Sequence, residues 1–144
     1  MTNLAAGFDE RLRALETELE QLAAERQRQA DLFTFAPEPQ LVTDAACNVL
    51  KANVAALALL RREGELRGHP LDWLVPMEQR RGFHSRVSAA LAGSGYARFA
   101  CSLRLRDGDL PVAFSVRVLR GRGEPLRLAW LVMPCHGRSP CESI

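Results

Sequence analysis

The segment Gln40–Leu60, QLVTDAACNVLKANVAALALL, constrains the fold more than any other part of the chain. Its residues predict a short strand over 41–43, a tight turn, and a second strand over 49–52. Asn53 follows directly and precedes an apolar stretch, 54–60, that favours a helix. Asn is a preferred helix N-cap, because its side-chain oxygen accepts hydrogen bonds from the free backbone N–H groups of the first turn. The segment therefore predicts two strands joined by a turn and followed at once by a helix.

Proline, glycine and the apolar pattern predict the rest of the domain. Gly64, Gly68, Pro70 and Pro76 leave room for only short helical turns in the next segment. Alternating apolar and polar residues then predict strands, and Asp107-Gly108 predicts a tight hairpin between two of them. The predicted elements are a long helix over 77–92 and strands over 99–105, 112–118 and 126–133.

This order of two strands, several helices and three strands resembles a PAS domain, over residues 33–133. The matching features are Asp44, Asn53, the Gly68-to-Pro76 segment, the Arg106-Asp107-Gly108 hairpin and Trp130 on the last strand. In that family an Asn at the place of Asn53 ends the second strand and starts the first helix. The resemblance implies an α+β fold, with one five-stranded antiparallel sheet and helices over one face. It also implies a regulatory role in signal transduction, through sensing and protein–protein interaction.

An amphipathic helix is predicted ahead of the domain, over 4–32. Its apolar residues recur with spacings of four and three, as in the heptad seam of a coiled coil. Arg26 and Gln29 interrupt the seam at core positions. Two interpretations stay open: a dimerisation helix, or a helix that folds onto its own domain. The predicted organisation is a helical segment over 1–32, a PAS domain over 33–133 and a short polar tail over 134–144.

The last predicted strand is apolar on both of its faces. Leu128, Trp130 and Val132 form one face, and Ala129, Leu131 and Met133 form the other. Such a strand is covered on both sides, so one cover must come from outside the sheet. We therefore expect a homodimer, with a monomer as the alternative. The expected interface residues are Phe8, Leu12, Leu15, Leu19, Leu22, Leu131 and Met133.

An apolar pocket is predicted between the long helix and the sheet. Its expected lining is Leu57, Phe83, Phe99, Cys101, Leu103, Val116 and Trp130. With few polar anchors, this set suits a packed core better than a site for a small apolar ligand. No cofactor is expected, with heme or such a ligand as the alternative. The resemblance places the ligand position of one group of heme PAS domains at Phe83, so His84, about 100° around the helix, should point away.

The cysteines give no metal site. None of Cys47, Cys101, Cys135 and Cys141 forms a C-x-x-C pair. Cys135, His136 and Cys141 lie in the polar tail without a fourth ligand, so an oxidisable or inert tail is the preferred interpretation.

Composition and motifs narrow the function. Net charge is +2, from 19 basic and 17 acidic residues, which gives no electrostatic reason to expect nucleic acid. No apolar run has the length of a membrane span, and no secretory signal is visible, so a cytoplasmic location is expected. Enzyme motifs are absent, so no catalysis is expected. The PAS resemblance puts Pro134 and His136 where many members carry an effector-coupling run, so we expect a module without its own output domain that acts on a partner protein in a signalling pathway. The alternatives are a heme- or redox-responsive PAS sensor and a small cone-fold α+β enzyme.

Overall fold

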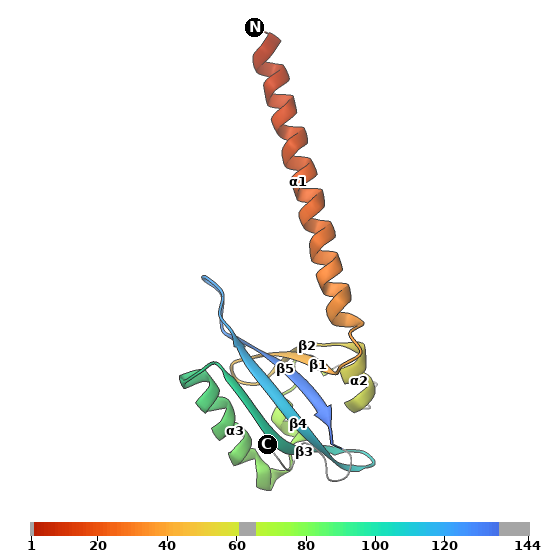
Figure 1. The fold of residues 1–144 in the computed structure, drawn as a ribbon, viewed down its shortest axis with the longest axis vertical. Helices are drawn as coiled ribbons and strands as arrows, with labels where there is room; N and C mark the ends of the chain where they lie inside the picture. Colours follow the sequence, from red (N-terminus) through yellow and green to blue (C-terminus); the bar gives the residue numbers. More distant parts are fainter. Residues whose placement is uncertain (1, 61–65, 136–144) are drawn as a thin grey trace. The chain divides into compact units, whose positions relative to one another are not determined.

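The computed structural model describes residues 2–60 and 66–135 and forms two compact units, Met1–Thr34 and Phe35–Ile144. The first unit is a single helix, α1 (Thr2–Thr34), shown in Figure 1. Strong helix formers (Ala, Leu, Glu, Gln and Arg) dominate its sequence. The helix extends two residues beyond each end of the predicted 4–32, and it ends shortly before Pro37, which disfavours helical geometry in the residue before it.

The second unit is a five-stranded antiparallel sheet with helices between its second and third strands, as predicted. The strand order is β2-β1-β5-β4-β3, so β2 and β3 are the edges. The elements are β1 (Gln40–Asp44), β2 (Val49–Ala52), α2 (Val54–Leu60), the 3-10 helix η1 (Leu71–Leu74), α3 (Met77–Ala92), β3 (Tyr96–Leu105), β4 (Gly108–Leu119) and β5 (Arg127–Pro134).

The hairpin strands β3 and β4 are longer than the apolar alternation predicts. Their ladder runs from Tyr96 opposite Arg117 to Leu105 opposite Gly108. Pro111 lies inside β4, where proline is normally excluded because it lacks an N–H donor. Pro111 pairs with Ser102 of β3. The N–H of Ser102 points away from β4 and donates to the side chain of Gln79 on α3. This pair therefore has no β3–β4 backbone hydrogen bond that the proline could remove.

The last strand is also shifted from its prediction. β5 covers Arg127–Pro134 instead of 126–133, because Val112 of β4 pairs with Pro134. The N–H of Cys135 then donates to the carbonyl of Pro111 at 2.9 Å, and the Cys135 side chain is buried. Of the predicted tail over 134–144, His136 and Cys141 lie outside the described residues.

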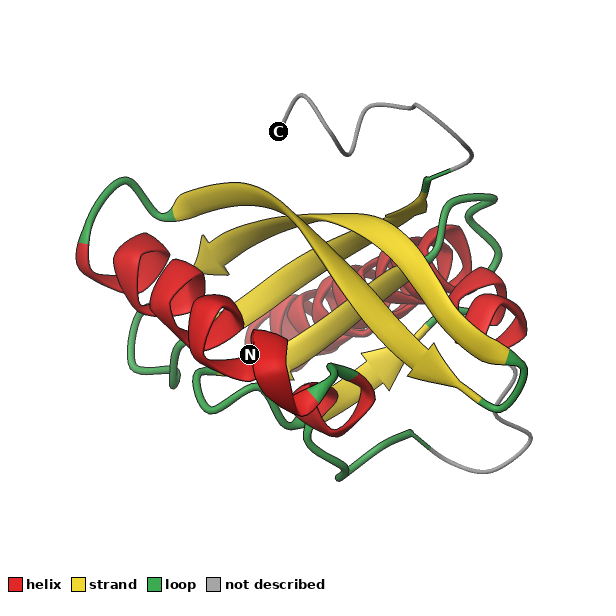
Figure 2. Ribbon diagram, turned by 90° about the horizontal axis from the view of Figure 1, so that it is seen from below, coloured by secondary structure: helices red, strands yellow, loops and turns green. Residues whose placement is uncertain are grey.

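The core lies between the inner face of the sheet and its helices. Figure 2 shows α3 running along the twisted sheet, with the shorter helices beside the other strands. Leu128, Trp130 and Val132 of β5 point into this core and are at most 2% exposed. On the opposite face Leu131 is half-buried and Met133 is exposed. The two apolar faces predicted for the last strand are therefore present, and only the inner one is closed within the described part of the domain.

The side chain of Asn53 links the first turn of α2 to the start of β1 and to the segment before β1. Its side chain is fully buried, and its Oδ1 accepts from the backbone N–H groups of Ala56 and Gln40, each at 2.9 Å. Its Nδ2 donates to the carbonyl of Glu38 at 2.8 Å and to that of Ala36 at 3.5 Å. The N-cap role predicted from the sequence is confirmed, and the same amide also fixes the start of β1 and the segment before it.

A second polar contact is buried beneath the sheet. The indole Nε1 of Trp130 donates to Oγ1 of Thr43 at 2.9 Å, and that hydroxyl donates in turn to the carbonyl of Asp44. Thr43 and Trp130 are both almost completely buried. Because a buried indole N–H without a partner would be costly, this bond fixes the position of Trp130 against β1.

We predict that Asn53→Ala lowers the free energy of unfolding by at least about 2 kcal/mol, because it removes a cap and leaves several buried backbone groups without partners. Chemical denaturation monitored by circular dichroism measures the change. Asn53→Asp is the comparison variant: it keeps an oxygen at the cap, but it buries a charge and turns a carboxylate oxygen toward the carbonyls of Glu38 and Ala36, so it should not restore the lost stability. An unchanged midpoint for Asn53→Ala would contradict the role given to this amide.

Candidate functional site: a filled aromatic core and an open groove beside it

The centre of the predicted pocket is occupied by four aromatic rings in mutual contact. The ring of Phe83 on α3 lies parallel to that of Trp130 on β5, at an interplanar angle of 7° and a centroid distance of 5.5 Å. Phe99 and Phe114 meet Phe83 edge to face, at 5.9 Å and 5.8 Å. Offset stacking and edge-to-face contacts are the favoured arrangements of aromatic pairs. The rings therefore pack against one another, in the space between α3 and the sheet.

The predicted pocket residues separate into a buried group and two outer members. Phe83, Phe99, Leu103, Val116 and Trp130 are at most 3% exposed and belong to one hydrophobic cluster. Leu57 on α2 is partly buried and packs against that cluster. Cys101 is half-buried and lies at the rim of an open groove. The residues predicted to line a pocket therefore form a packed core, and the open space lies at its edge, beside Cys101.

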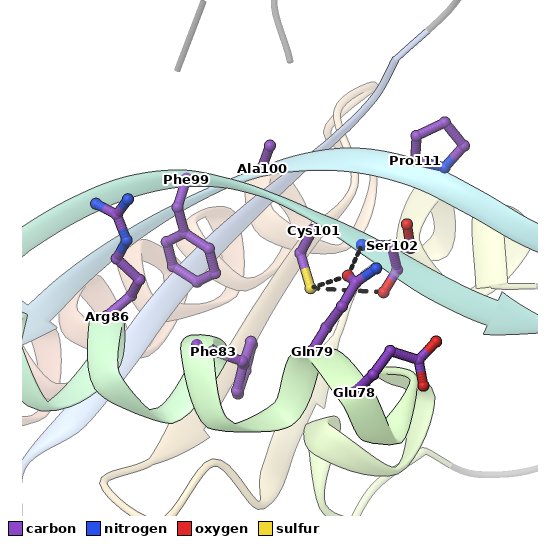
Figure 3. Close-up of a pocket in the computed structure, with 10 residues that line it drawn as sticks. Glu78, Gln79, Phe83, Arg86, Phe99, Ala100, Cys101, Ser102 and Pro111 are labelled. Atoms are coloured by element: carbon purple, nitrogen blue, oxygen red, sulfur yellow. Dashed lines mark hydrogen bonds between the residues drawn. The ribbon is translucent and has the colours of Figure 1, made fainter. Parts of the chain in front are cut away.

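The open space is a groove of about 500 Å³ between α3 and the edge strand β3 (Figure 3). Phe83 and Phe99 form its apolar floor, and polar side chains of α3 stand at its sides. No side chain covers Gly82, since a Cβ built there would meet nothing within 4 Å. The full lining is Glu78, Gln79, Gly82, Phe83, Arg86, Phe99, Ala100, Cys101, Ser102 and Pro111.

Gln79 connects the groove to the sheet. Its Oε1 accepts from the backbone N–H of Ser102 at 2.8 Å and from the thiol of Cys101 at 3.5 Å, as Figure 3 shows. β3 is an edge strand, so this N–H has no neighbouring strand to pair with. An unpaired edge group invites association with other chains, and Gln79 satisfies it from within the domain. The groove thus offers an apolar floor, an amide, and the opposite charges of Glu78 and Arg86 to a small molecule.

Cys47 and Cys101 are free thiols, and their surroundings make them poor nucleophiles. Burial raises the pKa of Cys47 to about 12, with further contributions from the carboxylates of Asp72 and Asp44. Burial also raises the pKa of Cys101, although a backbone hydrogen bond of Ser102 opposes the shift. Both thiols stay protonated at neutral pH, and the thiolate is the reactive form. Their environments therefore do not favour redox chemistry at these two positions.

His84 lies on the solvent side of α3. Its Nε2 is 3.0 Å from Oδ2 of Asp72 on η1, and its side chain is half-exposed, whereas Phe83 is buried in the core. The orientation predicted for these neighbouring residues is therefore confirmed. The proximity of His84 and Asp72 was not predictable, because it depends on the angle at which the chain turns from η1 into α3. The described residues contain no group of three or more His, Cys, Asp or Glu that could hold a metal ion.

The predicted interface residues lie on open surfaces. Phe8, Leu12, Leu15, Leu19 and Leu22 of α1 are between 42% and 65% exposed, and all lie on its heptad seam. On the outer face of the sheet, Leu131 pairs with Gln40 and Ser115, and Met133 pairs with Ala113. Within the described part of the chain, no helix is long and apolar enough to cross a membrane.

Two contributors to this region were missed from the sequence. Phe114 belongs to the aromatic cluster. Its place could have been predicted from the hairpin register, because pairing Leu105 with Gly108 puts Phe114 directly opposite Phe99. Gln79 gave no signal, because a glutamine on the polar side of a helix ordinarily faces water.

Comparison with known proteins supports the architecture. No family model matches the chain, and no curated protein matches it. Among solved structures, the PAS domain of an HTR-like protein from Haloarcula marismortui is 20% identical, with a TM-score of 0.65 over 83% of this chain and 98% of that one. A PAS domain of a protein from Colwellia psychrerythraea is 15% identical, with a TM-score of 0.67 over 81% and 97%. A LOV protein from Rhodobacter sphaeroides is 16% identical, with a TM-score of 0.64 over 79% and 70%.

These likenesses identify the class of fold. The five-stranded sheet, with its helices between the second and third strands, and the matches to solved PAS domains point to the same fold. The chain has the PAS fold, as its resemblance to the family predicted.

We predict that Phe83→Ala lowers the free energy of unfolding by about 3–5 kcal/mol, because it leaves a cavity among the other three rings. Phe83→Leu, which keeps most of the volume, should cost less than about 1.5 kcal/mol. Thermal and denaturant unfolding measure both. If Phe83→Ala cost no more than Phe83→Leu, the interior would be a loosely filled pocket instead of a packed core.

Proposed function

We propose that the protein is a regulatory sensor and protein-interaction module in signal transduction, which forms a homodimer through α1 and acts on a partner protein. The observation that carries the proposal is the exposed apolar seam from Phe8 to Leu22 on a helix joined to a PAS fold. Large apolar patches on the surface of a protein mark interaction sites, because water contact with them is unfavourable.

The sheet supplies a second apolar surface. Leu131 and Met133 lie on its outer face among small side chains, including Ala113, Ser115 and Ala129. Small residues leave a shallow surface on which a helix or a second sheet can pack. We therefore include this outer face in the proposed interface, together with the α1 seam.

Sensing is assigned to the groove between α3 and β3. The groove combines an aromatic floor with an amide and two charged side chains, which suits a small molecule better than a macromolecule. Among structures that share the fold, one is a domain of a sensory box sensor histidine kinase/response regulator from Geobacter sulfurreducens, 17% identical with a TM-score of 0.62 over 78% of this chain and 96% of that one. The proposal extends a sensory role of this kind to the present chain, in the cytoplasm and without catalysis of its own.

We predict that Leu15→Asp combined with Leu19→Asp converts a dimer into a monomer, because four carboxylates would enter the apolar seam of the pair. Light scattering coupled to size exclusion measures the mass. Ala14→Asp combined with Gln21→Asp is the matched control: it adds the same charges to the opposite side of α1 and should leave the dimer intact. Equal masses for the wild type and the seam variant would contradict dimerisation through α1.

We also predict that the purified protein is colourless, with absorbance from its aromatic residues alone, because ring packing fills the interior where a large chromophore would lie. An absorbance spectrum through the visible range tests this. A Soret band would contradict the assignment and favour a heme sensor. Native mass spectrometry of the same sample would reveal a colourless ligand as added mass.

A further inference from the structure

The seam of α1 has a definite heptad register. Leu12 and Leu19 fall at the a positions, and Phe8, Leu15 and Leu22 fall at the d positions. Arg26 occupies the next a position, where it ends the apolar seam. A coiled coil forms when such a seam packs against another helix, each a or d side chain entering a hole made of four residues on the facing helix. The seam therefore predicts where on α1 such holes should be found.

One such hole is present on the surface of α1. A hollow of about 540 Å³ is lined by Leu19, Leu22, Ala23, Arg26, Gln27 and Ala30. The first four residues have the spacing i, i+3, i+4, i+7, which is that of a coiled-coil hole. The small side chain of Ala23 keeps the hollow open on one side. In a parallel pair of helices in register, a hole built around a d residue receives the d residue of the other helix, which is Leu22 itself.

The charges beside the seam distinguish parallel from antiparallel packing. Asp9 and Glu16 occupy e positions, and Arg11 and Glu18 occupy g positions. In a parallel pair, each g residue lies near the e residue of the next heptad on the other helix. Arg11 of each copy then faces Glu16 of the other, and Glu18 faces the uncharged Ala23. This arrangement gives two attractive pairs and no repulsive one.

An antiparallel pair is less favourable. Full overlap of the leucine seam would set Leu12 of one helix against Leu15 of the other. Asp9 would then lie opposite Glu16 at both ends, which places like charges together, while Arg11 would lie opposite Glu18. Attraction and repulsion cancel in this arrangement, because each occurs twice.

Building on the proposed dimerisation, we infer that two copies of α1 pack parallel and in register, with Leu22 of each copy seated in the hollow of the other. Arg11 and Glu16 fix this orientation. The occupant of the α1 seam is therefore a second copy of this chain, and the PAS domains of the two copies follow from the same end of the paired helices.

The test uses charge reversal in the full chain. Arg11→Glu alone and Glu16→Arg alone should each weaken the homodimer roughly threefold to tenfold, because each turns two attractive pairs into two repulsive ones. An equimolar mixture of the two variants should recover the wild-type affinity as a heterodimer, in which both pairs are attractive again. Sedimentation equilibrium measures the dissociation constants, and high salt should reduce all the differences.

Other outcomes distinguish failure of the parallel orientation from failure of dimerisation itself. Tighter association of Glu16→Arg, with no recovery on mixing, would overturn the parallel orientation in favour of the antiparallel one while leaving dimerisation standing. A wild-type protein that stays monomeric at every concentration would overturn the proposed dimer itself. Arg13→Glu and Glu20→Arg, which reverse charges at b positions away from the seam, are matched controls and should leave the dissociation constant unchanged.

Discussion

The buried amide of Asn53 is the interaction on which the rest of the domain depends. Its two acceptor contacts join the first turn of α2 to the start of β1, and its two donor contacts hold Ala36 and Glu38 just before that strand. The amide supplies an acceptor oxygen and a separate NH₂ group with two donors, whereas aspartate lacks the donors and alanine lacks both. The path of the chain as it enters the sheet is thus set by one residue.

Once β1 is in place, packing of aromatic rings determines the interior of the domain. Trp130 is held by its bond to Thr43 and presents its face to Phe83, and the other rings close around that pair. Open volume lies beside the core, in the α3–β3 groove. Gln79 belongs both to that groove and to the edge of the sheet. A molecule that binds there by engaging its Oε1 would compete with the N–H of Ser102, so occupancy of the groove and the position of β3 are physically linked.

Much of this fold was predictable from the sequence, and the reason is local. The capping residue Asn53, the Asp107-Gly108 turn and the period-two strands act over a few residues, so the order of elements and most of their bounds follow from local chemistry. The interior of the candidate site was less predictable, because it depends on how segments far apart in the sequence meet. Phe83 and Trp130 were both expected at the pocket, but nothing local indicates that their rings stack and fill it. Gln79 and the Asp72–His84 contact depend in the same way on the final position of α3.

If α1 pairs as proposed, the short length of its apolar seam makes the pairing weak enough to be adjusted. Isolated helices gain little stability from propensity alone, and most helices in proteins are stabilised by packing of an apolar face. The apolar seam from Phe8 to Leu22 spans only about two heptads before Arg26 and Gln29 interrupt it, so a pair of such helices would be held by a modest area. Dimers of limited affinity respond to protein concentration and to anything that binds one state preferentially. A short seam joined to a domain with an open groove therefore provides a physical basis for regulation, since a small free-energy change at the domain would be enough to shift the equilibrium between one copy and two.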